Sequence, residues 1–193
     1  MQRLTAIFLL VGLSPLLAVL GLVTRISQGS PVLFRQQRSG LGGKLFSIAK
    51  FRSMTDRRDA NGELLPDEER VTAWGRFLRR SRLDELPGLW SIARGEMAFV
   101  GPRPLLPETI ASLGERGQER GKVRPGLTGW AQVNGNTLLS LDEKVALDLD
   151  YVRNPSLGRD LVILMRTFWV MIGGERRTSV AGSRAKPDLS QHR

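Results

Sequence analysis

The chain has 193 residues, with 29 lysines and arginines against 19 acidic residues and a formal net charge of +10 at pH 7. This length allows one well-packed core plus an attachment segment, and the charge suits an anionic partner such as phospholipid, a phosphorylated substrate or nucleic acid. Cysteine is absent, which excludes disulfides, and the only histidine is His192. Any bound metal is therefore expected to have oxygen ligands, as magnesium, manganese or calcium do.

An uncharged run of 20 residues, 4–23, lies near the start of the chain. A straight helix of this length would cover about 30 Å, roughly the hydrocarbon thickness of a bilayer. Three interpretations are open: a cleavable signal peptide, a single transmembrane helix, and a re-entrant segment that enters the membrane and turns back. No A-x-A cleavage site follows the run, which weakens the first interpretation.

The pair Ser14-Pro15 in the middle of this run favours the re-entrant form, although proline is tolerated in spanning helices. Pro15 lacks a backbone donor and clashes with the preceding turn, and the Ser14 hydroxyl can bond a carbonyl left unpaired at a bend. Each half is then about ten residues, or roughly 15 Å, enough to reach mid-bilayer and return. Positive charge on both sides is expected when both ends stay cytoplasmic; the flanking residues are Arg3, Arg25, Arg35 and Arg38.

Two short strands are predicted next, over 32–36 and 45–51, joined by a glycine turn into a hairpin. The turn sequence RSGLGGKLF does not have the Walker spacing of a phosphate loop, because Arg38 occupies the first glycine position and Leu45 follows Lys44. The polar, turn-rich sequence TDRRDANGELLPDEER is predicted to be a surface loop.

Helical spacing of apolar residues predicts an amphipathic helix over 71–82, and a further helix is predicted over 86–92. An extended piece then ends in the proline-rich sequence GPRPLLPE. Ser140 and Glu143 have the spacing of a capping box, which predicts that a helix begins there.

The sequence SLGRDLVILMRTFWVMIGG predicts a largely apolar final helix, with two interpretations open. Its apolar residues either cover the core or lie on a membrane surface. The residues Phe168, Trp169, Met171 and Ile172 go around the helix, and arginines lie nearby, which suits an interfacial helix on anionic lipid. Those arginines are Arg159, Arg166, Arg176 and Arg177.

The sequence SRLDELPG contains adjacent carboxylates, Asp84 and Glu85, at a predicted helix start. Acidic residues at this position are often only caps, because negative charge stabilises a helix N-terminus. Nearby arginines favour a chemical role, since a carboxylate among arginines is expected to have a lowered pKa and to stay ionised. It could then ligate magnesium or attack phosphorus to form an acyl phosphate, while arginines hold the phosphate oxygens. The arginines are Arg79, Arg80, Arg82 and Arg103.

Four blocks resemble the bacterial sugar transferase family, the monotopic polyprenyl-phosphate phosphoglycosyl transferases, in its minimal form without extra membrane spans. They are FRQQRSGLGGKLFSIAKFRSM, SRLDELPGLWSIARGEMAFVGPRPLLPE, VRPGLTGWAQVNG and LDLDYVRNPSLGRDLVIL. The resemblance implies an α+β fold with a re-entrant membrane helix-break-helix at the N-terminus, a small β-hairpin or sheet and several amphipathic interfacial helices. The expected parts are a re-entrant anchor over 1–28, a cytoplasmic interfacial catalytic domain over 29–178 and a disordered tail over 179–193.

The resemblance also implies an activity: transfer of a phosphosugar from a nucleotide diphosphate sugar, usually a UDP-sugar, to polyprenyl (undecaprenyl) phosphate, with release of UMP. Asp84 is the implied nucleophile, which forms a covalent phosphosugar intermediate and ligates the required Mg²⁺. Glu85 is implied to support catalysis, as a base toward the polyprenyl phosphate. Ser14 and Pro15 form the implied membrane break. The residues assigned to phosphate or substrate binding are Arg79, Arg103, Lys50 and Arg124.

Such an enzyme begins the synthesis of a bacterial surface glycan or glycoconjugate. The implied location is the inner membrane, with the catalytic domain on the cytoplasmic face. The expected partners are the nucleotide sugar, polyprenyl phosphate and anionic membrane lipid, without nucleic acid, and a homodimer is compatible with the sequence.

Two places depart from the family pattern and leave alternatives open. The first departure is at the N-terminus, where only MQRLTAIF precedes most of the apolar run, whereas relatives begin with basic residues and Phe-Asp. The second is Asn136, which follows QVNG at a position where relatives commonly have arginine. One alternative is a catalytically silent member that acts as a membrane-bound scaffold in glycan assembly. Another is a membrane-anchored basic protein that binds nucleic acid, which the 6% aromatic content and the absence of a DNA-binding motif disfavour.

Overall fold

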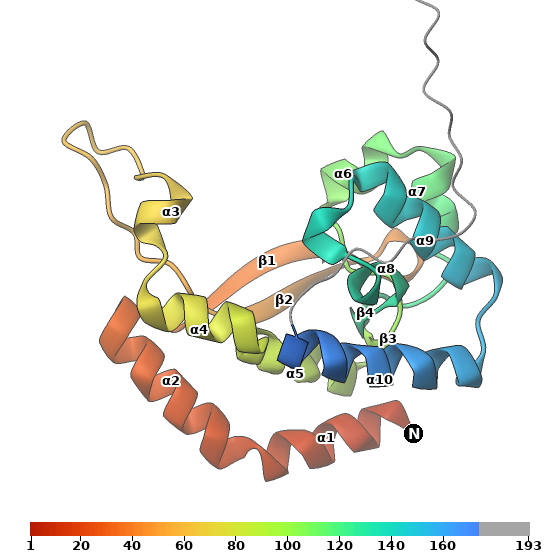
Figure 1. Ribbon diagram of the computed structural model, residues 1–193, viewed down its shortest axis with the longest axis horizontal. Helices are drawn as coiled ribbons and strands as arrows, with labels where there is room; N and C mark the ends of the chain where they lie inside the picture. Colours follow the sequence, from red (N-terminus) through yellow and green to blue (C-terminus); the bar gives the residue numbers. More distant parts are fainter. Residues whose placement is uncertain (174–193) are drawn as a thin grey trace, which may run out of the picture.

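The computed structural model describes residues 1–173 and shows an α+β protein with two small sheets and many short helices (Figure 1). The α+β class expected from the sequence is thus confirmed. The long β1–β2 hairpin crosses the middle of the molecule, and α1, α2 and α10 lie together on one side of it (Figure 1). The expected tail, 179–193, lies outside the described residues.

The elements follow one another in this order, with η marking 3₁₀ helices: α1 (Gln2–Gly12), α2 (Ser14–Gln28), β1 (Leu33–Ser39), η1 (Leu41–Gly43), β2 (Leu45–Phe51), α3 (Asp67–Arg70), α4 (Ala73–Ser81), η2 (Leu83–Gly88), α5 (Leu89–Arg94), β3 (Ala98–Val100), α6 (Pro107–Ser112), α7 (Glu115–Arg120), β4 (Gly126–Thr128), α8 (Trp130–Val133), η3 (Asn136–Leu138), α9 (Leu141–Arg153) and α10 (Leu157–Gly173).

The two sheets are both two-stranded. β1 and β2 pair antiparallel, with Phe34 opposite Lys50 and Gln36 opposite Ile48, so the predicted hairpin is confirmed. The predicted second strand has the observed bounds, whereas the first extends to Ser39 because its ladder continues to the start of β2. β3 and β4 pair in parallel and form the second sheet.

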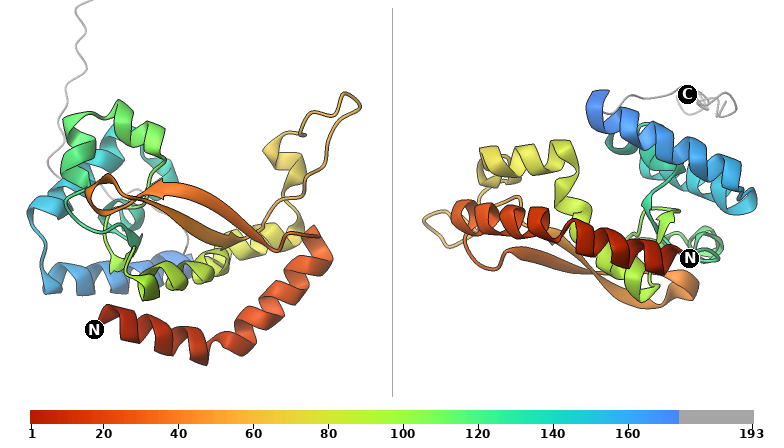
Figure 2. Two further views of the ribbon diagram at one scale, coloured as in Figure 1. Left: turned by 180° about the vertical axis from the view of Figure 1, so that it is seen from behind. Right: turned by 90° about the horizontal axis from the view of Figure 1, so that it is seen from below.

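The N-terminal helices form a bent pair. Within residues 1–173, no single helix is both long and apolar enough to cross a membrane, but α1 and α2 together have that length and composition and are bent by 62° at the break. The Ser14 hydroxyl donates to the Val11 carbonyl over 2.7 Å, which confirms the predicted bond at the bend. The left view of Figure 2 shows the resulting V from behind.

Both arms of this V are attached to the same folded body. Near the start of α1, the Arg3 side chain donates to the Ala93 carbonyl over 3.0 Å. Near the end of α2, the Trp74 indole donates to the Thr24 hydroxyl over 3.0 Å, and Thr24 is fully buried. Leu13 at the break also packs against the core, so the helix pair bends along the surface of the body.

The region around the acidic pair differs in detail from the sequence prediction. The predicted helix over 71–82 is α4, and the predicted helix over 86–92 is divided into η2 and α5. Pro87 lacks the donor that a continuous α-helix would need, and Arg82 adopts a left-handed conformation, with φ 59°, that ends α4. The predicted surface loop contains the short helix α3 and a bridge between Arg58 and Leu64.

The capping box at the start of α9 is confirmed: the Glu143 amide donates to the Ser140 hydroxyl, and the Ser140 amide donates to the Glu143 carboxylate.

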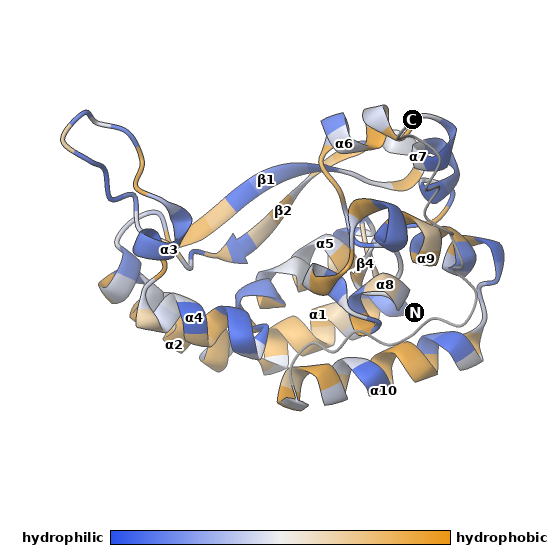
Figure 3. Ribbon diagram, turned by 45° about the horizontal axis from the view of Figure 1, so that its top comes forward, coloured by the Kyte–Doolittle hydropathy of each residue, from blue (hydrophilic) through white to orange (hydrophobic). Residues whose placement is uncertain are grey.

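The last described helix, α10, is mostly exposed. Only Ile163 in it is fully buried, so core packing accounts for little of its apolar surface. Figure 3 shows this helix mostly in the hydrophobic colour. Its exposed apolar residues include Leu157, Leu161, Met165, Phe168, Trp169 and Ile172.

The described arginines of α10 do not face outward with these apolar residues. Arg159 and Arg166 both lie over the Trp130 ring, at 4.7 Å and 5.1 Å from its centroid, and Arg166 also donates to the Asn134 side chain. The indole and the amide thus bind these two arginines on the protein side. The other two expected arginines, Arg176 and Arg177, lie outside the described residues.

Candidate active site

A cavity of about 760 Å³ lies between the β1–β2 hairpin, α4, η2 and the end of α10. Eight basic side chains line it against three acidic ones, so the cavity favours a polyanionic ligand. The basic residues are Arg38, Lys50, Arg52, Arg70, Arg79, Arg80, Arg82 and Arg103, and the acidic residues are Asp56, Asp84 and Glu85.

Asp84 lies at the start of η2, directly after the end of α4. This agrees with the prediction that the acidic pair lies at a helix start. Its exposure is only 9%, and its Oδ1 atom is buried without a hydrogen-bond partner. A buried carboxylate oxygen without a partner is costly unless a ligand satisfies it. This atom is therefore the candidate reactive or metal-binding group of the cavity.

Glu85, the next residue, is bound by two cations of the protein. Its Oε1 atom accepts from the Lys50 ammonium over 2.6 Å and from the Arg103 guanidinium over 3.0 Å. Lys50 comes from β2 and Arg103 from the chain after β3, so Glu85 joins cations from two separate elements. Both cations line the cavity beside Asp84.

The pKa values of the two neighbouring acids shift in opposite directions. Burial opposes ionisation of Glu85, but the charges of Arg103 and Lys50 outweigh burial and lower the pKa of Glu85 to about 2. Burial and the adjacent Glu85 charge raise the pKa of Asp84, and the surrounding cations do not compensate. The expectation of a lowered pKa is therefore wrong for Asp84, because burial and the Glu85 charge outweigh the nearby cations.

The Glu85 shift predicts a pH-dependent contribution to stability. The ordinary pKa of this carboxyl is 4.5 and the folded value is about 2, so ionised Glu85 stabilises the fold above pH 4.5 and this contribution is lost between pH 4.5 and 2. We expect the free energy of unfolding of Asp84→Asn to exceed that of the Asp84→Asn, Glu85→Gln variant by an amount that shrinks over this interval. Urea titrations in metal-free buffer at several pH values measure this difference. The Asp84→Asn background removes the neighbouring carboxyl, and a difference that does not change with pH would contradict the prediction.

The other residues predicted to bind phosphate are only partly brought together. Arg79 lines the cavity, and its Nε donates to the Ser53 hydroxyl over 2.7 Å. This contact depends on Gly75 in α4, since a Cβ atom there would lie 1.9 Å from the Ser53 carbonyl oxygen. Arg124 is exposed and is not among the residues that line the cavity, although its main-chain carbonyl lies against Gly101.

Two sets of cavity residues were missed by the sequence prediction. Gln36 and Arg38 share a face of β1 with Phe34, opposite Lys50 and Ile48, so strand alternation and register could have identified them. Asn136 has a φ of 42°, is 7% exposed and also lines the cavity. The position that departs from the family pattern is thus part of the site.

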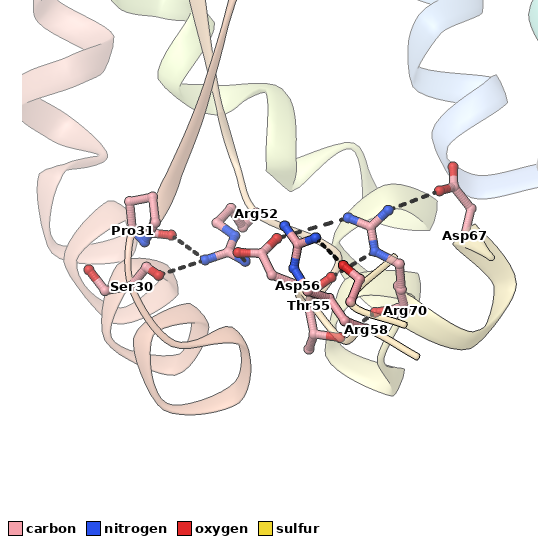
Figure 4. Close-up of polar contacts among 9 residues, drawn as sticks. Ser30, Pro31, Arg52, Thr55, Asp56, Arg58, Asp67 and Arg70 are labelled. Atoms are coloured by element: carbon pink, nitrogen blue, oxygen red, sulfur yellow. Dashed lines mark hydrogen bonds and ion pairs between the residues drawn. The ribbon is translucent and has the colours of Figure 1, made fainter. Parts of the chain in front are cut away.

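The second missed set is a cluster of polar contacts at one end of the cavity (Figure 4). Arg52 is 8% exposed and donates to the Ser30 and Pro31 carbonyls, over 2.9 and 3.2 Å, and to Asp56 over 2.7 Å. Arg70 donates to the Thr55 carbonyl over 2.9 Å. Arg52 thus fastens the chain that leaves α2 to the rim of the cavity. No local pattern marks this set, because its contacts join distant segments.

The cavity offers one side chain, Asp84, that is suited to bind magnesium. Within residues 1–173, no group of three or more His, Cys, Asp or Glu side chains could hold a metal ion by itself. The unpartnered Asp84 oxygen is a suitable single ligand, whereas the bonded Glu85 oxygen is occupied by two cations. Magnesium commonly takes one or two carboxylates, with substrate phosphates and water as its other ligands.

Comparison with known proteins identifies the class. A sequence profile described as bacterial sugar transferase matches residues 1–174, and the chain therefore belongs to the bacterial sugar transferase family. It is 48% identical over 162 residues to a Bacillus subtilis protein named uncharacterized sugar transferase EpsL, covering 84% of this chain and 80% of the relative. The family resemblance and the expectation of a sugar-phosphate transferase enzyme are thereby confirmed.

Other relatives are longer proteins. The chain is 42% identical over 176 residues to undecaprenyl-phosphate glucose phosphotransferase of Komagataeibacter xylinus, covering 84% of this chain and 33% of the relative. It is 35% identical over 185 residues to undecaprenyl-phosphate galactose phosphotransferase of Salmonella typhimurium, covering 86% of this chain and 38% of the relative. The chain thus spans about a third of the length of these two relatives.

Proposed function

We propose that this chain transfers a phosphosugar from a UDP-sugar to polyprenyl (undecaprenyl) phosphate through a covalent phosphosugar on Asp84. The observation that carries the proposal is the unpartnered, buried Asp84 oxygen in a cavity lined by eight cations. The names of the glucose and galactose phosphotransferases described above include undecaprenyl phosphate, which supports this acceptor and the transfer of a sugar phosphate.

In the first step, an Asp84 carboxylate oxygen forms a bond to the phosphorus that bears the sugar. The bond from this phosphorus to the bridging oxygen breaks, and UMP leaves with the electron pair. The negative charge that develops on the leaving group requires nearby cations. Lys50, Arg79 and Arg103 line the cavity around Asp84 and would supply them.

In the second step, an oxygen of polyprenyl phosphate attacks the same phosphorus. The Asp84–phosphorus bond breaks, so that the carboxylate is regenerated and polyprenyl diphosphate sugar is released. An ionised phosphate oxygen needs no proton removed, and a carboxyl with a pKa of about 2 is a weak base. We therefore assign Glu85 to the positioning of Lys50 and Arg103 in place of proton transfer.

Magnesium is a proposed cofactor, with Asp84 as its protein ligand. When bound, it would neutralise charge on the donor diphosphate. Asp84 can act both as the nucleophile and as the magnesium ligand, because a carboxylate has two oxygens and Oδ1 has no protein partner.

The bent helix pair supports a proposed location at the cytoplasmic face of the inner membrane. Its exposed apolar residues suit lipid, and both arms return to the same body. The exposed face of α10 lies on the same side of the molecule and suits the membrane interface, including anionic lipid. An enzyme placed there can reach a soluble donor and a lipid-embedded acceptor.

The proposed function is tested by intact-protein mass spectrometry of the purified chain in lipid nanodiscs. The chain is incubated with magnesium and a panel of UDP-sugars that includes UDP-glucose and UDP-galactose, without polyprenyl phosphate. We expect a mass gain of one phosphosugar with at least one donor, and its loss when polyprenyl phosphate is added. A folded protein that gains no mass with any donor would favour the scaffold alternative. Strong, salt-sensitive binding of nucleic acid in the same sample would favour the other alternative.

A further inference from the structure

The chain that carries Arg103 is fixed mainly through its carbonyl groups. Its sequence, GPRPL, has two prolines, which supply no N–H donors, so the main chain is held by donors from elsewhere. Four successive carbonyls each accept a hydrogen bond. The pairs are Gly126 N–H to Pro102, Arg120 side chain to Arg103, Arg38 side chain to Pro104 over 3.3 Å, and Ser39 N–H to Leu105 over 3.1 Å.

The donor to the Arg103 carbonyl belongs to a buried ion pair. Arg120, the last residue of α7, donates through Nε to Asp148 of α9 over 2.8 Å, and each side chain is only 4% exposed. The remaining guanidinium edge donates to the Arg103 carbonyl. Asp148 thus fixes the orientation of a guanidinium that holds the main chain of a cavity residue. That residue, Arg103, in turn contacts Glu85.

Joining α7 to α9 does not require this pair. Two exposed pairs, Arg116 with Asp142 and Arg153 with Glu119, join the same two helices over 2.9 and 2.8 Å. Burying two charges is costly, and apolar replacements of a buried pair are often neutral or stabilising. The contact that distinguishes Arg120 from Arg116 and Arg153 is the one to the Arg103 carbonyl.

We infer that Arg120 and Asp148 are positioning residues that hold Arg103 in its catalytic place through its main-chain carbonyl. Arg120 touches no substrate in this arrangement and acts only through Arg103. The inference rests on the proposed function for its kinetic consequences. A displacement of the order of 1 Å at a phosphate-binding group can lower the rate about 100-fold.

The test compares the double variant Arg120→Met, Asp148→Leu with the control Arg116→Gln, which removes an exposed pair between the same helices. We expect the double variant to unfold within a few degrees of the wild type and to lose about 10- to 100-fold in kcat/KM for the UDP-sugar. The control should keep wild-type kcat/KM. Hydrogen exchange of the Gly126 and Ser39 amides, which donate to the carbonyls of Pro102 and Leu105, should be faster only in the double variant.

A double-mutant cycle separates positioning from general stability. In an Arg103→Ala background, the double variant should cause less than about a twofold further loss, because the residue it positions is already absent. Equal losses in both backgrounds, or unchanged kcat/KM with unchanged exchange, would overturn the inference. If the double variant does not fold, the variant Arg120→Lys provides the test. Lysine keeps a positive charge for Asp148 but lacks the planar guanidinium that contacts both Asp148 and the Arg103 carbonyl. Wild-type kcat/KM in this variant would again overturn the inference. Lack of turnover in the wild type would reject the proposed function instead, and amide exchange would still test the positioning.

Discussion

Asp84→Asn is expected to abolish the phosphosugar adduct and to lower turnover by at least about 10³-fold, while the fold becomes no less stable. The amide has the shape of the carboxylate but is not a nucleophile. The buried Oδ1 atom makes no hydrogen bond, so the change breaks no contact of that atom. Intact mass and turnover report the chemistry, and thermal unfolding reports the stability.

The sign of the stability change follows from the pKa of Asp84. Its folded pKa is raised by burial and by Glu85, so the ionised group destabilises the fold at neutral pH. Removing this charge should therefore raise or preserve the melting temperature. The control is Asp142→Asn, which changes an 82% exposed carboxylate and should keep wild-type turnover. An adduct on Asp84→Asn, or a turnover loss below about tenfold, would show that another residue is the nucleophile.

Replacing Pro15 with leucine is expected to convert part of the protein to the opposite N-terminal topology. Leucine removes a cost of about 3 kcal/mol for proline inside a helix, so that α1 and α2 can join. The continuous helix, residues 2–28, would be about 40 Å long and could span the bilayer. The N-terminus would then lie on the side opposite the catalytic domain.

This change can be measured with one cysteine added at the N-terminus, because the natural sequence has none. We expect a membrane-impermeant maleimide to label the wild type only from the cytoplasmic side, and Pro15→Leu from both sides in part. Leu16→Ala leaves the break intact and should behave as the wild type. The hydrogen bonds of Arg3 and Trp74 to the body oppose the change, so conversion is expected to be incomplete. Labelling of the wild type from the far side would contradict the re-entrant proposal.

The features that could be predicted from the sequence are local ones. Pro15 and Ser14 indicated the break, and the structure shows the bend and the Ser14 bond there. The glycine turn predicted the hairpin, and the spacing of Ser140 and Glu143 predicted the start of α9. Each depends on backbone restriction or on neighbours within a few residues, which a single sequence contains in full.

The chemical state of the site was decided by the tertiary structure. The sequence placed Asp84 and Glu85 among arginines and treated their charges alike, but burial and the position of Lys50 separate their pKa values. Arg124 was expected at the site and lies outside the cavity lining.

The same holds for the residues that support the site. Arg120 and Asp148 lie 28 positions apart and form a buried pair, although no role was predicted for either of them from the sequence. Segments far apart in the chain had to pack before desolvation and pairing could be known. Sequence by itself therefore determined the family, the broken N-terminal helix pair and the acidic pair. Only the tertiary structure decided which acid has a buried oxygen without a partner, because burial and charge pairing depend on contacts between distant residues.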